Sequence, residues 1–405
     1  MADKTNLYRR KILKELYFGA NLSCADLFVT VKKSFPIITK LLNELVEEGA
    51  VLETGYATST GGRRPLTYAI KADIMYVVSV AMDQFITRIA IMDMKNNLVT
   101  KVEKFDLNLS EDLKPIQVIV EKIEQVIKSS GITKNKILGI GIGMPGFVDA
   151  EKGINYTFFN AADETVSNYI TDKTSIPTFI DNDSSLVALA ELRFGEAINK
   201  KNAMVINIGW GIGLGLILNG ELFRGNNGFA GEFSHIPLFT NNKLCSCGKS
   251  GCLETETSLV TIIDKAKEGL SSGRLSKLNP ALLQDLEQAI ESIMKAAQQG
   301  DRFAIELFTE AGYNIGRGVA ILIHILNPEM VILSGRGSSA GKVLKAPIQQ
   351  AINEYCIPRL SHNTSIEIST IGYMAELIGA AALVMENFDK DPGKIRAASF
   401  EGVLS

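Results

Sequence analysis

Three cysteines and one histidine lie close together in the sequence with the spacing of a metal site. Cys245, Cys247 and Cys252 follow a C-x-C-x4-C pattern, and His235 lies ten residues before the first of them. Three thiolates and one imidazole make a complete four-coordinate shell for Zn²⁺. Two glycines inside the loop allow the chain to wrap around an ion. The pattern therefore predicts a closed, structural zinc site rather than one that activates water.

A second segment with suggestive chemistry reads Gly-Gly-Arg-Arg-Pro and spans residues 61–65. The glycines allow close backbone approach, and the planar guanidinium groups of Arg63 and Arg64 fit a narrow minor groove of DNA. Short apolar strands are expected on either side, at 51–54 and 66–70. Together these features predict a wing that contacts DNA.

Three short helices are expected before this wing, and Ser23, three residues before Asp26, is a start signal for the second of them. The third, residues 34–48, buries an apolar stripe at i, i+3, i+4, i+7 and i+8 and ends at Gly49. This order is typical of a winged helix-turn-helix, in which the third helix reads the major groove. The residues expected to contact DNA are Ser34, Pro36, Thr39, Lys40, Arg63 and Arg64.

Charge is divided in the same way. Residues 1–71 hold 11 Lys/Arg and 7 Asp/Glu, a net charge of +4, whereas the remainder holds 31 and 38, a net charge of −7. A basic head on an acidic body favours a DNA-binding module attached to a small-molecule domain. The polar start and the absence of a long apolar run predict a cytoplasmic protein that does not enter the membrane.

The rest of the chain alternates strand-like and helix-like segments. Strands are expected at 74–80, 88–93, 137–143, 178–180, 204–209, 213–218 and 330–334, and helices at 116–127 and 184–194. Two regions each open with paired strands and continue as strand–helix units. This pattern predicts a duplicated α/β architecture with two lobes and a cleft between them.

Several motifs in this body resemble the ROK family of repressors, open reading frames and sugar kinases. They are Gly141–Asp149, the Asp181-Asn182-Asp183 triplet, Gly231–His235, Cys245–Glu254 and Gly316–Pro328 with the turn at Gly335. They cover nearly all of the chain after residue 72, and the winged head resembles the repressor branch. The resemblance implies an α/β fold in which the winged helix-turn-helix precedes a two-lobed actin/hexokinase-like (ribonuclease H-like) sugar-kinase fold.

The expected domains are a DNA-binding head at 1–72, an N-terminal lobe at 73–185 and a C-terminal lobe with the zinc loop at 186–405. The final helix is a candidate to return to the first lobe. The expected partners are double-stranded operator DNA and a sugar or sugar phosphate effector, and the expected assembly is a homodimer or a dimer of dimers.

A sugar is held by several polar groups that converge on its hydroxyls. The expected sugar-binding residues are Gly146, Asn182, Asp183, Glu232, His235 and Glu254. A zinc-bound His235 would hold itself and Glu232 in place, and its second ring nitrogen would be free for a hydroxyl. By resemblance, Asp183 occupies the position of the catalytic base in family kinases. Ser234 replaces the usual Gly before the His, and the segment 160–164 departs from the family pattern, so the identity of the sugar does not carry over.

The alternative function is an ATP-dependent sugar kinase with a fused DNA-binding head. Family kinases carry a glycine-rich phosphate loop on the first hairpin, whereas residues 80–87 of this chain contain no glycine. The second loop, residues 209–213, keeps its glycines, but Trp210 replaces a small hydroxyl residue. We therefore expect no enzymatic activity and no catalytic residue. A third alternative is a zinc-bearing scaffold that binds no ligand.

Overall fold

The computed structural model describes residues 2–57, 64–109, 115–159 and 164–390, and the chain divides into two compact units. The first comprises Met1–Asp183 with Leu377–Ser405, and the second Ser184–Glu376. Arg63 and most of the 160–164 segment lie outside the described residues. The three-domain division expected from the sequence remains a prediction.

The head begins the first unit with three helices and three strands. They are α1 (Ala2–Gly19), β1 (Leu22–Ser23), α2 (Cys24–Val31), α3 (Phe35–Glu47), β2 (Val51–Tyr56) and β3 (Leu66–Ile70), with sheet order β1-β3-β2. The Ser23 side chain accepts from the backbone N–H of Asp26 in a capping box, which starts α2 as the sequence predicted. The order of elements is that of a winged helix.

The core of the head lies beneath α3. Ile38, Leu41, Leu42 and Leu45 are buried on one face of α3, as the apolar spacing predicted. Val46, the last residue of the expected stripe, is only half-buried, because it lies at the edge of this face. Because an α-helix has 3.6 residues per turn, about two to three residues in each turn of α3 face away from the core of the head and are available for other contacts.

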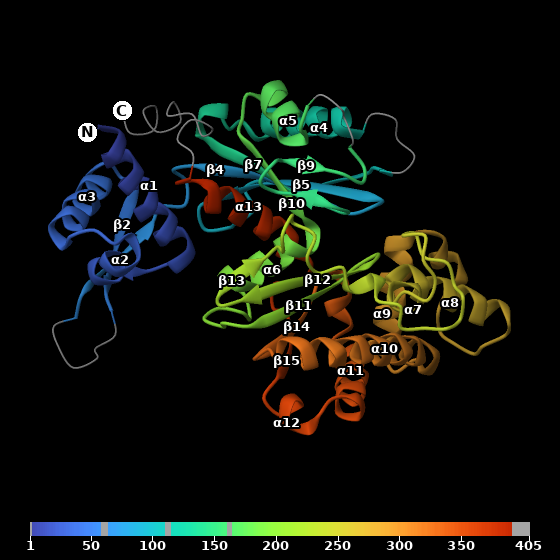
Figure 1. Cartoon of the computed structure of the whole chain (residues 1–405). Helices are drawn as coiled ribbons and strands as arrows, with labels where there is room; N and C mark the ends of the chain where they lie inside the picture. The colour runs from blue at the N-terminus through green and yellow to red at the C-terminus, as the bar shows by residue number, and fades with distance from the viewer. Residues whose placement is uncertain (1, 58–63, 110–114, 160–163, 391–405) are drawn as a thin grey trace. The chain divides into compact units, whose positions relative to one another are not determined.

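A five-stranded sheet follows, in the order β10-β7-β4-β5-β6. Its strands are β4 (Tyr76–Met82), β5 (Ile86–Asp93), β6 (Glu103–Asp106), β7 (Ile137–Met144) and β10 (Thr178–Asn182). Helices α4 (Pro115–Ser130) and α5 (Val166–Thr174) cover one face, and α13 (Ala375–Asn387) lies on the other (Figure 1). Gly141 makes room for α13, because a Cβ there would lie 2.0 Å from the carbonyl oxygen of Ala380.

All four strands predicted for this sheet differ from the observed ones by one or two residues at one end or both. The first strand begins at Tyr76 rather than Ile74, and β10 continues past Ile180 to Asn182. The extension follows from parallel pairing with β7, in which Asn182 lies opposite Met144. This pairing carries Asn182 to the carboxyl end of the sheet. The small two-stranded sheet of β8 (Val148–Asp149) and β9 (Ile154–Asn155) follows β7.

The second unit contains another five-stranded sheet, in the order β13-β12-β11-β14-β15. Its strands are β11 (Ala203–Ile208), β12 (Ile212–Leu218), β13 (Glu221–Phe223), β14 (Met330–Ser334) and β15 (Ser365–Ile368). Helix α6 (Asp183–Phe194) lies on one face, and α10 (Arg302–Leu326) and α11 (Lys342–Tyr355) lie on the other (Figure 1). The remaining helices are α7 (Glu254–Thr257), α8 (Leu259–Ser271), α9 (Leu286–Gln298) and α12 (Pro358–Ser361).

None of the helices formed by the described residues is long and apolar enough to cross a membrane.

Candidate metal centre and sugar-binding residues

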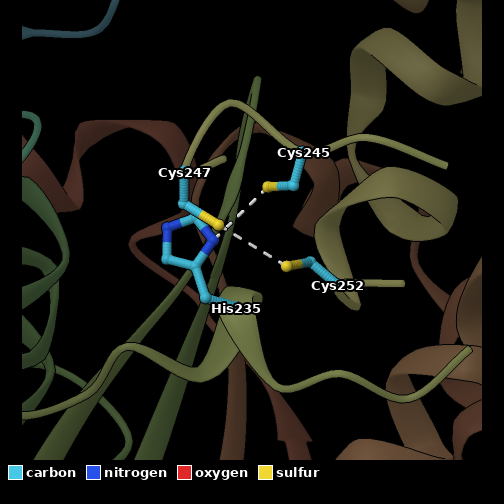
Figure 2. Close-up of side chains that lie close together, drawn as sticks. All are labelled: His235, Cys245, Cys247 and Cys252. Carbon is cyan, nitrogen blue, oxygen red and sulfur yellow. Dashed lines mark hydrogen bonds between the residues drawn. The ribbon is translucent and has the colours of Figure 1, made fainter. Parts of the chain in front are cut away.

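The histidine and three cysteines predicted to bind metal come together in the second unit. His235 ends a short 3₁₀ turn, Phe233–His235, and the cysteines follow on an irregular loop. The four side chains point toward one another, with all candidate ligand atoms within 4.8 Å of each other (Figure 2). This group can hold a metal ion.

The distances within the cluster agree with tetrahedral coordination. The Sγ atoms of Cys247 and Cys252 are 3.6 Å apart, and Cys245 Sγ lies 3.5 Å from His235 Nδ1. With Zn–S and Zn–N bonds of about 2.3 and 2.0 Å, the edges of a tetrahedron are roughly 3.8 Å for S···S and 3.5 Å for S···N. These two edges and the chemistry of the four ligands fit Zn²⁺.

The loop that carries the cysteines is held by its own backbone. The N–H of Gly248 donates to Cys245, and the N–H of Cys245 donates to Lys249. Gly251 adopts a φ of +76°, and a Cβ there would lie 2.0 Å from the carbonyl oxygen of Phe239. Only glycine fits this position, so the tight path of the loop at Gly251 requires this residue.

Cys247 and Cys252 differ in the pKa of their thiols. Burial raises the pKa of the Cys252 thiol to about 12, and its sulfur neighbours act in the same direction. A backbone N–H from Lys249 lowers the pKa of the exposed Cys247 thiol. Because a metal binds the thiolate, binding must displace the proton that burial stabilises on Cys252.

Three of the expected sugar-binding residues, Glu232, His235 and Glu254, gather beside this cluster. His235 Nδ1 faces the cysteines, while its Nε2 lies 3.7 Å from Glu232 Oε2. The two ring nitrogens thus face different groups, and the second, which was expected to be free for a hydroxyl, lies beside Glu232. The backbone N–H of Ile212 donates to the Glu254 carboxylate, which also lies against Gly211. Zinc at the cluster would fix the orientation of the imidazole next to both carboxylates.

Both carboxylates are partly withdrawn from water. The Glu232 side chain keeps 43% of its surface exposed, yet surrounding protein raises its pKa, opposed by His235. Burial also raises the pKa of Glu254. These acceptors lie close enough to influence each other, because Glu254 contributes to the raised pKa of Glu232. Such paired acceptors suit neighbouring hydroxyl groups.

The other three expected residues, Gly146, Asn182 and Asp183, gather in the first unit. Asn182 is the last residue of β10, Asp183 is the first of α6, and the Asn182 side-chain amide donates to the Gly146 carbonyl at 3.2 Å. Gly146 has a φ of +87°, and a Cβ there would lie 2.6 Å from Thr157. The turn after β7 therefore requires glycine and is held by Asn182.

The expected DNA-contacting residues that the structure describes are mostly accessible. Ser34, Pro36, Lys40 and Arg64 are exposed. Thr39 is half-buried, and its hydroxyl donates to the Phe35 carbonyl at 3.0 Å, so this group is engaged within the helix. Phe35, which was not among the residues expected to contact DNA, is 51% exposed. Helical spacing alone would predict burial, because Phe35 lies three residues before Ile38 on the apolar side of the helix.

In both of the hairpin turns that the sequence analysis compared with phosphate loops, other groups of the protein contact the turn. In the first unit, Asp83 Oδ1 accepts from the N–H groups of Phe85 and Ile86 at 2.8 and 2.7 Å. In the second unit, Trp210 is 6% exposed, and the guanidinium of Arg336 lies 4.7 Å from the centre of the indole. The Arg336 guanidinium also lies over the ring of Tyr373. Arg336 could not be identified from the sequence, because Tyr373 is distant from it in the chain.

Comparison with known proteins identifies the family. The ROK family model matches residues 79–387. The chain is 30% identical over 383 residues to the xylose repressor of Caldicellulosiruptor bescii, covering 93% of this chain and 94% of that protein. It is 33% identical over 273 residues to a glucokinase of Halalkalibacterium halodurans, covering 66% of this chain and 82% of that protein.

A solved structure extends the match to the head. The crystal structure of a ROK family transcriptional regulator, a homologue of the Escherichia coli MLC protein, aligns with a TM-score of 0.75 and 25% identity. The alignment covers 98% of this chain and 99% of that one. The sequence motifs, the two sheets and the His/Cys loop therefore have a common explanation: the chain belongs to the ROK family.

Proposed function

We propose that this protein is a transcriptional repressor whose winged head binds operator DNA and whose ROK portion binds a sugar or sugar phosphate. The observation that carries the proposal is the nearly full-length match to a xylose repressor, which includes both the winged head and the ROK region. A match confined to the ROK region would be equally compatible with a kinase.

The head has the features of a DNA-binding module. Ser34, Pro36 and Lys40 are exposed on and before α3, and Arg64 is exposed beside the wing. Arg63 remains part of the proposed contact set by its sequence position. Since a winged helix usually reads one half-site, we propose a homodimer that binds an inverted repeat.

We propose that zinc has a structural role in this protein and is bound by His235, Cys245, Cys247 and Cys252. Four protein ligands complete a tetrahedral shell. The ion would stabilise the loop and fix His235 beside Glu232. We propose that Glu232, His235 and Glu254 bind sugar hydroxyls, and that Gly146, Asn182 and Asp183 also take part in sugar recognition.

The kinase alternative is disfavoured by both hairpin turns. The amides of Phe85 and Ile86 already donate to Asp83, so they are not available to a phosphate. Trp210 fills the glycine turn of the second sheet and packs on Arg336. We propose that Asp183 binds ligand without acting as a base, because no phosphate-binding loop is open to deliver a phosphoryl group.

We propose that the sugar signal reaches the head through contacts within the first unit. Lys14 of α1 donates to Asp389 Oδ1 at 2.8 Å and to the carbonyl of Glu386 at 3.0 Å, at the end of α13. The Tyr17 hydroxyl also contacts Asn96, which lies in the turn after β5. A shift of α13 would therefore displace α1. We propose that the sugar favours the state with weaker operator binding and so acts as an inducer.

The test measures operator affinity by fluorescence anisotropy with and without sugars. A thermal-shift screen of xylose, other monosaccharides, amino sugars and their phosphates first identifies the ligand. We expect the ligand to weaken operator binding by roughly 5- to 150-fold. Glu232→Gln and Asp183→Asn should bind the operator normally and lose the response, whereas Glu221→Gln, an exposed control in β13, should retain it.

Two results would contradict this proposal. Equal operator affinity with and without the ligand would remove the regulatory role, and tighter binding would make the sugar a corepressor. Sugar-dependent ADP release that is lost in Asp183→Ala would instead establish the kinase.

A further inference from the structure

The first turn of α3 exposes three consecutive apolar residues. Phe35 is 51% and Ile37 44% exposed, and Pro36 between them is exposed as well. The core of the head does not need them, because the buried face of α3 is filled by residues from Ile38 to Leu45. A cluster of large apolar side chains at the tip of a helix is typical of a binding surface.

The charges around α3 indicate which end approaches a polyanion. Its first turn carries no acidic side chain, and the exposed Lys32 lies just before it. The dipole of the helix adds partial positive charge at this end. The acids lie at the other end, where Glu44 and Glu48 pair with Arg9. Only the N-terminal end of α3 is therefore suited to enter a groove lined by phosphates.

The polar groups next to this turn are partly engaged. The Thr39 hydroxyl donates to the Phe35 carbonyl, and Lys40 Nζ lies 3.7 Å from Glu44 Oε1. The chemistry that the first turn presents is thus mainly apolar. In the major groove, the apolar feature that distinguishes one base from the others is the 5-methyl group of thymine.

We propose that Phe35 and Ile37 are specificity-determining residues that contact thymine 5-methyl groups in the major groove of the operator. The inference rests on the proposed DNA-binding function and deepens it. Phe35 and Ile37 lie on opposite flanks of the helix, because two residues along a helix are separated by about 200°. They therefore contact different thymines within one half-site.

The experiment uses the full-length protein and DNA that it selects from a random duplex pool. Each thymine of a selected half-site is replaced in turn by uracil, which removes only the 5-methyl group. Binding is measured by fluorescence anisotropy. Loss of one buried methyl should weaken binding by about fourfold. We expect this loss at two or more thymine positions in each half-site.

Variants then assign each methyl to a side chain. Phe35→Ala should weaken binding to the thymine duplex. In this variant, replacing one particular thymine by uracil should weaken binding less than twofold. Ile37→Ala should have the same two effects, with the smaller uracil effect at another thymine. Phe35→Leu, which keeps apolar surface, should retain part of the effect. Phe223→Ala is the matched control, because Phe223 is 46% exposed on β13 in the second unit.

The outcomes separate this inference from the function on which it rests. If no duplex is enriched, DNA binding itself fails, and both proposals are overturned. If DNA is enriched but uracil has no effect, only the methyl contacts are overturned. The methyl contacts are also overturned if Phe35→Ala and Ile37→Ala keep the full uracil effect. The same holds if these variants alter the mass of the assembly in sedimentation and leave DNA binding unchanged. Circular dichroism of each variant verifies that the head remains folded.

Discussion

The two five-stranded sheets have the same topology but differ in the turn that joins the first two strands. In each sheet the first two strands pair antiparallel, the third lies at the edge, and two later strands add in parallel. The β4–β5 turn contains no glycine, whereas the β11–β12 turn contains Gly209 and Gly211. The same framework can thus support turns with different chemistry.

The difference lies in what occupies the backbone at each turn. At the β4–β5 turn, the Asp83 carboxylate takes the N–H groups that could otherwise bind an anion. At the β11–β12 turn, glycine remains, and Trp210 and Arg336 occupy the adjacent space. The two sheets thus keep one framework while each turn has its own internal contacts.

The largest expected effect comes from the metal loop, which belongs to the second unit alone among the residues described. Cys252→Ser should abolish stoichiometric metal and lower the free energy of unfolding by several kcal/mol, because structural zinc supplies folding energy directly. Metal analysis and urea denaturation provide the measurement. Cys356→Ser replaces a buried cysteine outside the cluster and should keep the metal.

Hydrogen exchange can localise this effect. Amides of the loop and of α7 should lose protection in Cys252→Ser, whereas amides of β4 and β7 should keep theirs. Equal loss in both sheets would show that the units do not unfold separately. Full metal content in Cys252→Ser would contradict the four-ligand site.

The second effect concerns how closely helices approach the sheets. Gly141→Ala should destabilise the protein by about 1–3 kcal/mol, because the new Cβ would overlap the Ala380 carbonyl of α13. Gly209→Ala is the matched control, because the nearest atom to a Cβ there, apart from those of the adjacent residues, would be the Gly211 carbonyl oxygen at 3.8 Å. Urea midpoints compare the two. Similar midpoints would mean that α13 can shift away from β7 at little cost.

The third effect is at the turn without glycine. Asp83→Ala should lower the free energy of unfolding by about 1–2 kcal/mol, because the N–H groups of Phe85 and Ile86 lose a charged acceptor. Asp83→Asn keeps an acceptor oxygen and should recover most of this loss. Neither variant should release ADP in the presence of sugar. If Asp83→Ala gained such activity, Asp83 would be the main block to phosphate binding.

Much of this architecture could be predicted from local patterns. The apolar spacing of α3, the capping box at Ser23 and the strand at Met330–Ser334 are all present as expected. Each depends on residues close together in the sequence. The His/Cys group was predictable for the same reason, since its ligands lie within a short loop and their chemistry is specific.

Contacts between distant segments could not be predicted in this way. The Arg336–Tyr373 stack and the contact of Lys14 with Asp389 join residues whose proximity depends on the tertiary fold. The exposure of Phe35 depends on where the head core ends, which helical periodicity does not specify. The two groups of expected sugar-binding residues were likewise named from motifs, and the structure supplied their local partners.

The smallest expected effect tests how the glycine turn is filled. The Arg336 guanidinium lies 4.7 Å from the centre of the Trp210 ring and 4.2 Å from that of Tyr373, and it also pairs with Glu287 at 2.7 Å. Arg336→Lys keeps the charge but loses the flat surface that packs between two rings. We expect the free energy of unfolding to fall by about 1 kcal/mol. Arg302→Lys, at an exposed pair with Glu306, should have a smaller effect. Urea denaturation measures both, and tryptophan fluorescence reports the local change, since the chain contains a single tryptophan. If the two variants lost equal stability and the emission spectrum of Arg336→Lys were unchanged, charge alone, rather than stacking, would hold Arg336 against this turn. The contrast between the two hairpins would then depend on Asp83 and not on Trp210.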